Sequence, residues 1–324
     1  MRAAVLAGLW CVVGGAAQLV EVRKIWDQAP HNAFTDLARF KNRWYCAFRE
    51  GEKHVSPDGA IRVLSSSDGR IWESAAHFTS AADLRDPKLA VTPDQRLMLT
   101  GYSVVREKPE IPARTLAWFS SSGRDWTEPV AIGEAGMWLW RVRWHGGVAY
   151  STGYGQQASR LYASRDGERF GTLVEKLYEE GYPSEGTLLF LEDGAGLCLL
   201  RRDGQPPTAL LGTARPPYRA WRWKDLGVRV GGPNMIHLPD GRIVAAARLH
   251  DGKVRTGLCW LDAQAGTLTE FLTLPSGGDT SYPGLVFHDG LLWVSYYSSH
   301  EGKTSIYLAK VKLPAVRSLP QRGQ

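Results

Sequence analysis

Aromatic and basic side chains alternate over a short stretch near the middle of the chain, where they could bind a sugar. Trp138, Trp140 and Trp144 surround Arg141 and Arg143. Indole rings offer flat apolar faces for stacking, and a guanidinium is a strong donor to oxygen ligands. The tryptophans could equally pack between neighbouring sheets. The stretch therefore predicts either a sugar subsite, with Arg141 among its binding residues, or a packed interior.

Motifs of several other enzyme classes are missing or incomplete. Residues 299–304 end like a phosphate-binding loop, but Tyr297 stands where that motif requires glycine, and no helix is expected to follow. The eight histidines show no His-Glu-x-x-His motif and no close cluster in the sequence, so we expect no cofactor and name no metal site, while a structural ion is left open. No Gly-x-Ser-x-Gly motif is present, which disfavours a serine hydrolase.

Composition and charge favour an all-β globular protein with no nucleic-acid partner. The 324 residues are 44% hydrophobic and 22% charged, and 35 glycines, 13 tryptophans and 12 tyrosines favour many short strands with tight turns. The formal net charge is only +6. One basic cluster, which could be a solvated face or could attract acidic glycans, comprises Arg215, Arg219, Arg222, Lys224 and Arg229. No signature of RNA or DNA binding accompanies it.

The first residues have the pattern of a secretion signal. Arg2 supplies a positive start, residues 3–13 form an apolar run, and Gly15, Ala16 and Ala17 suit a cleavage site. This pattern predicts a signal peptide at residues 1–17 and a secreted or periplasmic protein with one domain, residues 18–324. The apolar run is about half the roughly 20 residues of a membrane span, so we expect no span after cleavage, with an uncleaved anchor as the alternative.

Six apolar runs recur roughly every 50 residues, a period typical of repeated small sheets. They occupy residues 43–49, 96–102, 148–154, 197–202, 243–248 and 292–297. Turn sequences precede three of them, as a hairpin between the first two strands of each sheet requires. The repeats predict an all-β fold, a six-bladed β-propeller with four-stranded antiparallel blades.

A second repeat lies downstream of the first three runs. Its copies are SSDGRIW at residues 66–72, SSSGRDW at 120–126 and SRDGERF at 164–170. In each copy a serine or aspartate can cap the turn backbone, glycine can take a positive φ, and the aromatic ring can pack between sheets. The copies resemble Asp boxes, or BNR repeats, which form the hairpin between the third and fourth strands of a blade.

On these repeats the chain resembles the sialidase, or neuraminidase, superfamily of six-bladed propellers over nearly its whole mature length. The resemblance implies that a terminal strand closes the ring, which suits the strand-like ends near residues 20–25 and 305–311. It also implies that the first strand of each blade lines a central channel. The expected first strands lie at residues 31–37, 83–89, 138–143, 183–187, 231–236 and 279–285.

Two of these strands resemble the segments that carry the nucleophile of exo-sialidases. They are YPSEGTL at residues 182–188, which contains Glu185, and DTSYPGL at residues 279–285, which contains Tyr282. The resemblance implies that Tyr282 attacks the anomeric carbon and that Glu185 takes its proton. Otherwise Tyr282 is a packed turn residue and Glu185 caps a backbone amide.

The resemblance also implies an acid/base aspartate in the loop between the second and third strands of blade one. Asp58, in the SPDGA stretch at residues 56–60, matches that position, and Asp86 of blade two is the reserve candidate. Pro-Asp-Gly is a strong turn sequence in its own right, so a structural role for Asp58 is the alternative.

Sialidases hold the substrate carboxylate with three arginines, and the resemblance supplies matches for two of them. The blade-four arginine is Arg201 by alignment of the flanking Asp-Gly pairs, or Arg202 by strand register. The blade-five arginine is Arg255. Each of these residues could equally be a solvated charge at the end of a strand.

The chain departs from the family on the first strand of blade one. The sequence NAFTD at residues 32–36 replaces the expected Phe-Arg-Ile-Pro motif, so no arginine stands there. Arg49 could reach the same volume from the next strand, and Arg248 is a further candidate to bind an acidic group. Alternatively, His31, Asn32 and Asp36 could bind a different substrate group. The departure makes sialic acid less expected than glycoside chemistry in general.

The sequence thus predicts an exported, retaining exo-type glycoside hydrolase that acts on a terminal, possibly acidic, sugar of a carbohydrate partner. The alternative from another class is a non-catalytic propeller that binds a glycan or a protein. A third reading is a lyase or another glycosidase that uses Tyr282 with a different base. A hydrogen bond between Tyr282 and Glu185, with arginines around it, would favour the hydrolase.

Overall fold

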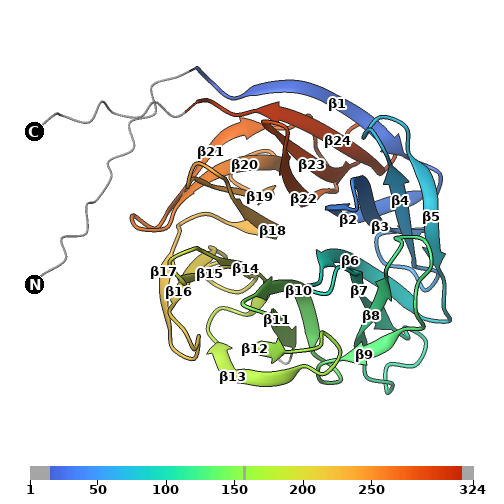
Figure 1. Cartoon of the computed structure of the whole chain (residues 1–324), viewed down its shortest axis with the longest axis horizontal. Coiled ribbons are helices and arrows are strands. Elements are labelled where there is room, and N and C mark those ends of the chain that lie inside the picture. The colour runs from blue at the N-terminus through green and yellow to red at the C-terminus, as the bar shows by residue number, and fades with distance from the viewer. Residues whose placement is uncertain (1–14, 156–157, 316–324) are drawn as a thin grey trace, which may run out of the picture.

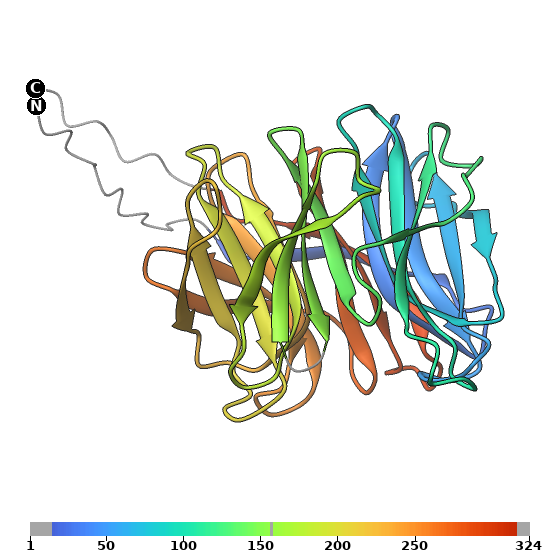
Figure 2. The same ribbon diagram turned by 90° about the horizontal axis from the view of Figure 1, so that it is seen from below.

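A computed structural model describes residues 15–155 and 158–315 of the chain (Figure 1). The described residues form strands, turns and loops, with no helix among them. Their 24 strands make six four-stranded antiparallel sheets around a central axis. Figure 2 shows the strands running between the two faces of the ring, so the turns lie on these faces. The prediction of an all-β, six-bladed propeller is confirmed.

The first three blades follow one another along the chain (Figure 1). Blade one comprises β2 (His31–Phe40), β3 (Arg43–Gly51), β4 (Ala60–Ser66) and β5 (Glu73–Phe78). Blade two comprises β6 (Asp83–Val91), β7 (Leu97–Val104), β8 (Arg114–Ser120) and β9 (Val130–Ile132). Blade three comprises β10 (Trp138–His145), β11 (Val148–Gly155), β12 (Ala158–Ser164) and β13 (Gly171–Tyr178).

The other three blades complete the ring. Blade four comprises β14 (Pro183–Phe190), β15 (Gly196–Arg202), β16 (Leu210–Ala214) and β17 (Trp221–Asp225). Blade five comprises β18 (Val230–His237), β19 (Ile243–Leu249), β20 (Arg255–Asp262) and β21 (Thr267–Thr273). Blade six comprises β22 (Thr280–His288), β23 (Leu291–Ser298), β24 (Ser305–Lys312) and β1 (Gln18–Trp26). The expected first strands overlap the six inner strands, and the apolar runs overlap the six second strands.

The ring is closed by the N-terminal strand. β1 pairs antiparallel with β24, from Gln18 opposite Lys312 to Trp26 opposite Ile306. The first strand of the chain is therefore the outermost strand of the last blade, as Figure 1 shows. The pairing is interrupted by irregularities between Leu19 and Glu21 and between Lys24 and Trp26. The predicted closure by a terminal strand is confirmed.

Hydrophobic side chains fill the spaces between neighbouring blades. Successive residues of a strand point to opposite faces of its sheet, so each blade contributes to one cluster on either side. Between blades one and six, for example, Trp44 and Trp293 stack with their ring centroids 4.1 Å apart. Such a pair contributes about 0.5–1.5 kcal/mol beyond the apolar area that it buries. Packing between blades, rather than one central core, holds the ring together.

The three heptad repeats form tight turns between the third and fourth strands of blades one, two and three. In the first copy the Ser66 hydroxyl accepts a hydrogen bond from the Gly69 amide at 2.8 Å, and Asp68 accepts one from the Arg70 amide at 2.8 Å. Gly69 has a φ of +70°, and a Cβ there would lie 2.4 Å from the Trp293 ring. Glycine is therefore required both by the turn and by the neighbouring blade.

All six inner strands share one irregularity. Near its beginning each strand bulges, so that two of its residues oppose one residue of the second strand. The bulges contain Phe34, Asp86, Trp140, Glu185, Gly232 and Tyr282. Phe34, Asp86 and Tyr282 have positive φ angles of 62°, 46° and 49°. Because a bulge re-aims side chains and such angles are costly for bulky residues, we expect a functional site at this ring of bulges.

Most of the predicted secretion signal, residues 1–14, lies outside the described residues. β1 begins directly after it, at Gln18. Across residues 15–155 and 158–315, no helix has the length and apolar character to cross a membrane. Export of the chain stays a prediction.

Candidate active site

Tyr282 and Glu185 meet at the ring of bulges, although 97 residues separate them in sequence. Tyr282 comes from β22 of blade six and Glu185 from β14 of blade four. The Tyr282 hydroxyl donates a hydrogen bond of 2.6 Å to Oε1 of Glu185. Tyr282 is only 7% exposed and Glu185 only 5%. The structure thus brings together the two residues predicted to form the nucleophile.

Arg201 completes a hydrogen-bonded triad with this pair. Its Nη1 donates to Oε2 of Glu185 at 2.8 Å and to the Tyr282 hydroxyl at 3.0 Å. Arg202, the next residue of β15, points to the other face of the sheet, where it donates to the backbone oxygen of Thr208 at 2.7 Å. Of the two blade-four alternatives, Arg201 is the arginine that reaches the pair.

Gly232 of β18 lets the pair come together. Its amide donates a 2.6 Å hydrogen bond to Oε2 of Glu185. Its φ is +57°, and a Cβ there would lie 2.5 Å from the Tyr282 ring. Any other residue would push the ring away from Glu185, so glycine is needed for this contact.

The surroundings of the pair fix where its proton lies. Burial alone would raise the pKa of the Glu185 carboxyl, but Arg201 and the hydrogen bonds from Tyr282 and Gly232 outweigh burial and lower that pKa. Burial, reinforced by the negative charge of Glu185, raises the pKa of Tyr282 well above its usual range. The site therefore holds a neutral phenol against a carboxylate, an arrangement in which a carboxylate can accept the proton of a phenol.

Aromatic rings form the wall behind Tyr282. Phe34 meets it edge to face with the centroids 5.2 Å apart, Trp140 does so at 5.6 Å, and Tyr297 lies at 5.9 Å. Phe34 stands on the strand where the family resemblance implied an arginine. An apolar ring therefore occupies that part of the site, and its contact holds the Tyr282 ring in one orientation.

Arg248 is the second guanidinium near Tyr282. It lies 5.1 Å above the ring centroid, within the range of a cation–π contact. Arg255, which the resemblance assigned to this role, instead pairs with Glu270 at 3.1 Å and with Asp251 at 3.0 Å on the outer part of blade five. The structure therefore brings Arg248, and not Arg255, to Tyr282.

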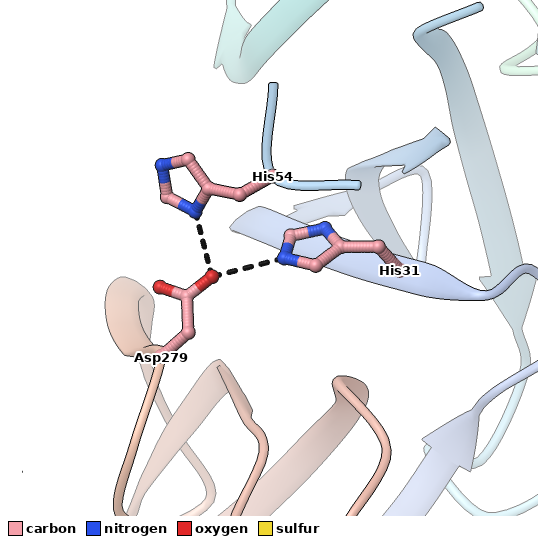
Figure 3. A group of neighbouring side chains, drawn as sticks. All are labelled: His31, His54 and Asp279. Carbon is pink, nitrogen blue, oxygen red and sulfur yellow. Dashed lines mark hydrogen bonds and ion pairs between the residues drawn. The ribbon is translucent and has the colours of Figure 1, made fainter. Parts of the chain in front are cut away.

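Asp279, His31 and His54 form a cluster beside Arg248, where blade six meets blade one (Figure 3). Oδ2 of Asp279 is 2.9 Å from Nε2 of His31 and 2.6 Å from Nδ1 of His54. Its other oxygen is 3.3 Å from Nη2 of Arg248. Burial would raise the pKa of Asp279, but the hydrogen bonds from the histidines outweigh burial and hold that pKa far below its usual range.

The same three side chains could hold a divalent cation, because their ligand atoms lie within 4.8 Å of one another. Arg248 already supplies a positive charge to the Asp279 carboxylate. This favours a hydrogen-bonded cluster of His31, His54 and Asp279, called the clasp below, over a metal site. Sequence patterns do not reveal this cluster, because residue 279 is far along the chain from residues 31 and 54. Only closure of the ring brings residues 31 and 54 to residue 279.

The two candidate acid/base residues have opposite surroundings. Asp86 is buried at the β6 bulge, and burial raises its pKa despite the positive charges of Arg85 and Lys88. Asp58 lies in the exposed loop after β3 and accepts a 2.9 Å hydrogen bond from the Glu52 amide. Burial opposes the effect, but hydrogen bonds lower the pKa of Asp58. A proton donor needs a raised pKa, so the environment of Asp86 suits that role better.

Two other predicted binding residues lie in sealed ion pairs. Nε of Arg49 is 2.8 Å from Oδ1 of Asp83, and neither side chain is exposed. Nη1 of Arg141 is 2.7 Å from Oδ2 of Asp36, and these side chains are also buried. No contact with Tyr282 or Glu185 is present among the described residues. Their observed partners point to a structural role.

Phe34 and Gly232 also belong to the site. Neither carries a charged or hydroxyl group, so their chemistry does not single them out in the sequence. A weaker signal was present, since a proline directly follows the bulge residue in three inner strands, at positions 87, 233 and 283. Proline inside a sheet is confined to edges and bulges. Aligning the inner strands on this proline places Gly232 in one ring with Asp86 and Tyr282.

Comparison with known proteins gives structural relatives only. No family model matches the sequence, and no curated protein sequence is similar to it. A protein of unknown function from Dyadobacter fermentans DSM 18053 superposes with a TM-score of 0.81 at 18% identity, over 92% of this chain and 99% of that chain. The GH93 α-L-arabinofuranosidase of Fusarium graminearum, solved with arabinobiose, gives 0.68 at 14% identity, over 92% and 98%.

A Trypanosoma rangeli sialidase is also similar, with a TM-score of 0.68 at 12% identity. The match covers 92% of this chain and 60% of that chain. At these identities the likeness concerns the fold, and the fold is the six-bladed propeller that sialidases and GH93 enzymes share. The fold implied by the sialidase resemblance is therefore confirmed.

Proposed function

We propose that the protein is an exported, retaining glycoside hydrolase that removes a terminal sugar. The observation that carries the proposal is the hydrogen-bonded triad of Tyr282, Glu185 and Arg201 at the ring of bulges. A phenol held against an ionised carboxylate is a costly arrangement to bury unless it is used. The presence of glycosidases among proteins of the same fold agrees with this reading.

In the first step the Tyr282 oxygen attacks the anomeric carbon, and its proton passes to Oε1 of Glu185, 2.6 Å away. Tyr282 needs this base because its raised pKa keeps the phenol protonated. The bond between the anomeric carbon and the leaving oxygen breaks. The carboxyl group of Asp86 gives its proton to that oxygen, and a glycosyl-tyrosine is left.

In the second step water attacks the same carbon from the face that the leaving group occupied. Asp86, now a carboxylate, takes the proton of the water. The Tyr282 oxygen departs and recovers its proton from Glu185. Two displacements at one carbon restore its configuration, so the enzyme retains the anomer.

The choice of Asp86 as the acid rests on its burial and on its place in the ring of bulges. The charge of Glu185 adds to the raised pKa of Asp86, so the two carboxyl groups act on each other electrostatically. Environments that drive the pKa values of two carboxyl groups in opposite directions separate the roles of acid and base. Asp58 stays the alternative that the family resemblance implies.

The site favours an uncharged sugar over an acidic one. Arg201 is already paired with Glu185 at 2.8 Å and with Asp203 at 2.7 Å, and Arg248 is paired with Asp279. A substrate carboxylate would have to compete with these partners for both guanidinium groups. The near burial of the Tyr282–Glu185 pair also limits access to the end of a glycan chain. A neutral terminal sugar such as arabinofuranose meets both conditions.

The test is a screen of 4-nitrophenyl glycosides, including α-L-arabinofuranoside, beside 4-methylumbelliferyl sialoside. Wild type and Tyr282→Phe are assayed together. We expect turnover of a neutral glycoside with retention of configuration by NMR, and a loss of about 10³-fold in kcat/KM in the variant. Full activity in Tyr282→Phe would remove the nucleophile, and no turnover of any glycoside by wild type would favour the non-catalytic binder.

A further inference from the structure

A small aromatic cavity lies beside the Tyr282–Glu185 pair, where blades two, three and four meet. Its volume is about 170 Å³. It is lined by Tyr102, Gly136, Trp138, Tyr154, Gly155, Tyr182 and Pro183. None of these residues carries a charge, and four carry aromatic rings. Aromatic walls with a few phenolic hydroxyls are the surface on which the apolar face of an uncharged sugar ring can stack.

The rings of the cavity are held rigid before any ligand binds. Trp138 stacks on Tyr102 with a centroid separation of 4.1 Å and an interplanar angle of 9°. It also stacks on Tyr154, at 5.5 Å and 15°. Rings fixed in this way lose little conformational entropy when a ligand packs on them.

The backbone on one side of the cavity carries no side chains. A Cβ on Gly155 would lie 2.5 Å from the backbone oxygen of Gly136, so a larger residue would displace this part of the wall. Gly136 itself has a φ of +80°. Because these two facing glycines have no side chains, the space between the aromatic rings stays open.

Tyr182 stands at the rim and is not explained by packing. It is 53% exposed, although it is a large aromatic residue, and its φ is +54°. A bulky residue in the left-handed region is strained, and such strain persists where the surrounding structure enforces it. Here the Tyr182 carbonyl accepts a 3.0 Å hydrogen bond from the Asp203 amide, which fixes the backbone. The ring is thereby presented to solvent at the cavity mouth.

The cavity is one side chain away from the reacting groups. Trp140 lies 6.2 Å from Trp138 on one side and 5.6 Å from Tyr282 on the other, measured between ring centroids. On the opposite wall, Pro183 is two residues before Glu185. Tyr154, another lining residue, also lies 6.4 Å from Trp140, measured between ring centroids. A sugar next to the one being cleaved would reach the cavity.

We propose that this cavity binds the first sugar of the leaving group, as an uncharged ring stacked against the aromatic walls, with Tyr182 in contact with it at the cavity mouth. The inference rests on the proposed function, because in an enzyme that removes a terminal sugar the only adjoining sugar is the leaving one. Tyr182 then selects glycans over small glycosides without touching the reacting atoms. Its expected contribution is to substrate binding and not to bond cleavage.

The experiment compares two substrates that differ only in the leaving group, arabinobiose and α-L-arabinofuranosyl fluoride. In Tyr182→Ala we expect kcat/KM for arabinobiose to fall about 10-fold more than kcat/KM for the fluoride, chiefly through KM. Tyr182→Phe keeps the ring and should recover most of the loss. The control is Ile71→Ala, which removes another exposed apolar side chain at a heptad turn, remote from the cavity.

Equilibrium binding separates failure of this inference from failure of the proposed function. Arabinobiose is titrated calorimetrically into Tyr282→Phe, which keeps the cavity, and into the double variant with Tyr182→Ala. Weaker binding in the double variant supports the cavity even if wild type hydrolyses nothing. Equal losses of kcat/KM on both substrates, or equal binding by the two proteins, would overturn the inference and leave the hydrolase proposal standing.

Discussion

Both halves of the ring place arginines beside carboxylates near the bulges of the inner strands, but the arginines differ in how much of their surface stays exposed. In blades one to three, the Arg49 and Arg141 side chains are 0% and 2% exposed and are sealed against Asp83 and Asp36. In blades four to six, Arg201 and Arg248 keep 20% and 16% of their side-chain surface. A guanidinium that keeps an open face can meet a substrate, whereas a sealed one serves the fold.

The sharpest test of the open half is Glu185→Gln. An amide cannot accept the Tyr282 proton, so we expect kcat/KM to fall about 10³-fold, while the free energy of unfolding also falls because the charge that Arg201 stabilises is lost. Steady-state kinetics and urea unfolding measure the two quantities. The matched control is Glu270→Gln, which alters another glutamate–arginine pair, that with Arg255, away from the site. A comparable loss in the control would mean that any disturbed ion pair lowers activity.

The corresponding test of the sealed half is Arg49→Met. The substitution removes one of the arginines that pair with the buried Asp83 carboxylate, at 2.8 Å, while Arg85 at 3.3 Å and Arg106 at 2.7 Å remain. Leaving a buried charge with no partner costs about 3–5 kcal/mol, and the two remaining arginines keep the loss below that range, so the urea midpoint should fall measurably. Arg248→Met, in the open half, should cost less because water reaches its partner. If the two variants lose the same free energy of unfolding, the exposure of the arginine does not decide how much its ion pair stabilises the fold.

Sequence reasoning identified the period, the strands and the pairing of Tyr282 with Glu185, because each depends on local pattern or on a motif. The Arg49–Asp83 pair shows where such reasoning ends. Arginine at a strand end looks the same in sequence whether a carboxylate seals it or not, and the sealing partner is supplied by the next blade. For the same reason Arg248 took the place assigned to Arg255, and the cluster around Asp279 emerged only from ring closure.

A pH profile can decide between Asp86 and Asp58. Activity requires Glu185 ionised and the acid protonated, so the rate falls below the lowered pKa of Glu185 and above the raised pKa of the acid. Asp86→Asn should lower kcat/KM about 10²-fold for a glycoside with a poor leaving group and should remove the high-pH limb. Asp58→Asn is the matched variant, and loss of that limb in it alone would restore Asp58 as the acid.

The smallest expected effect concerns the clasp of His31, His54 and Asp279. Asp279→Asn weakens the grip on Arg248, so we expect KM to rise about 3-fold to 10-fold while kcat changes less, since Arg248 faces the Tyr282 ring and not its hydroxyl. Dialysis against EDTA should leave both constants as they are. If the three side chains instead held a cation, the chelator would reproduce the effect of the substitution, and added Zn²⁺ would reverse it only in wild type. That outcome would show that His31, His54 and Asp279 form a metal site between blades six and one. Arg248 would then no longer be held by the Asp279 carboxylate.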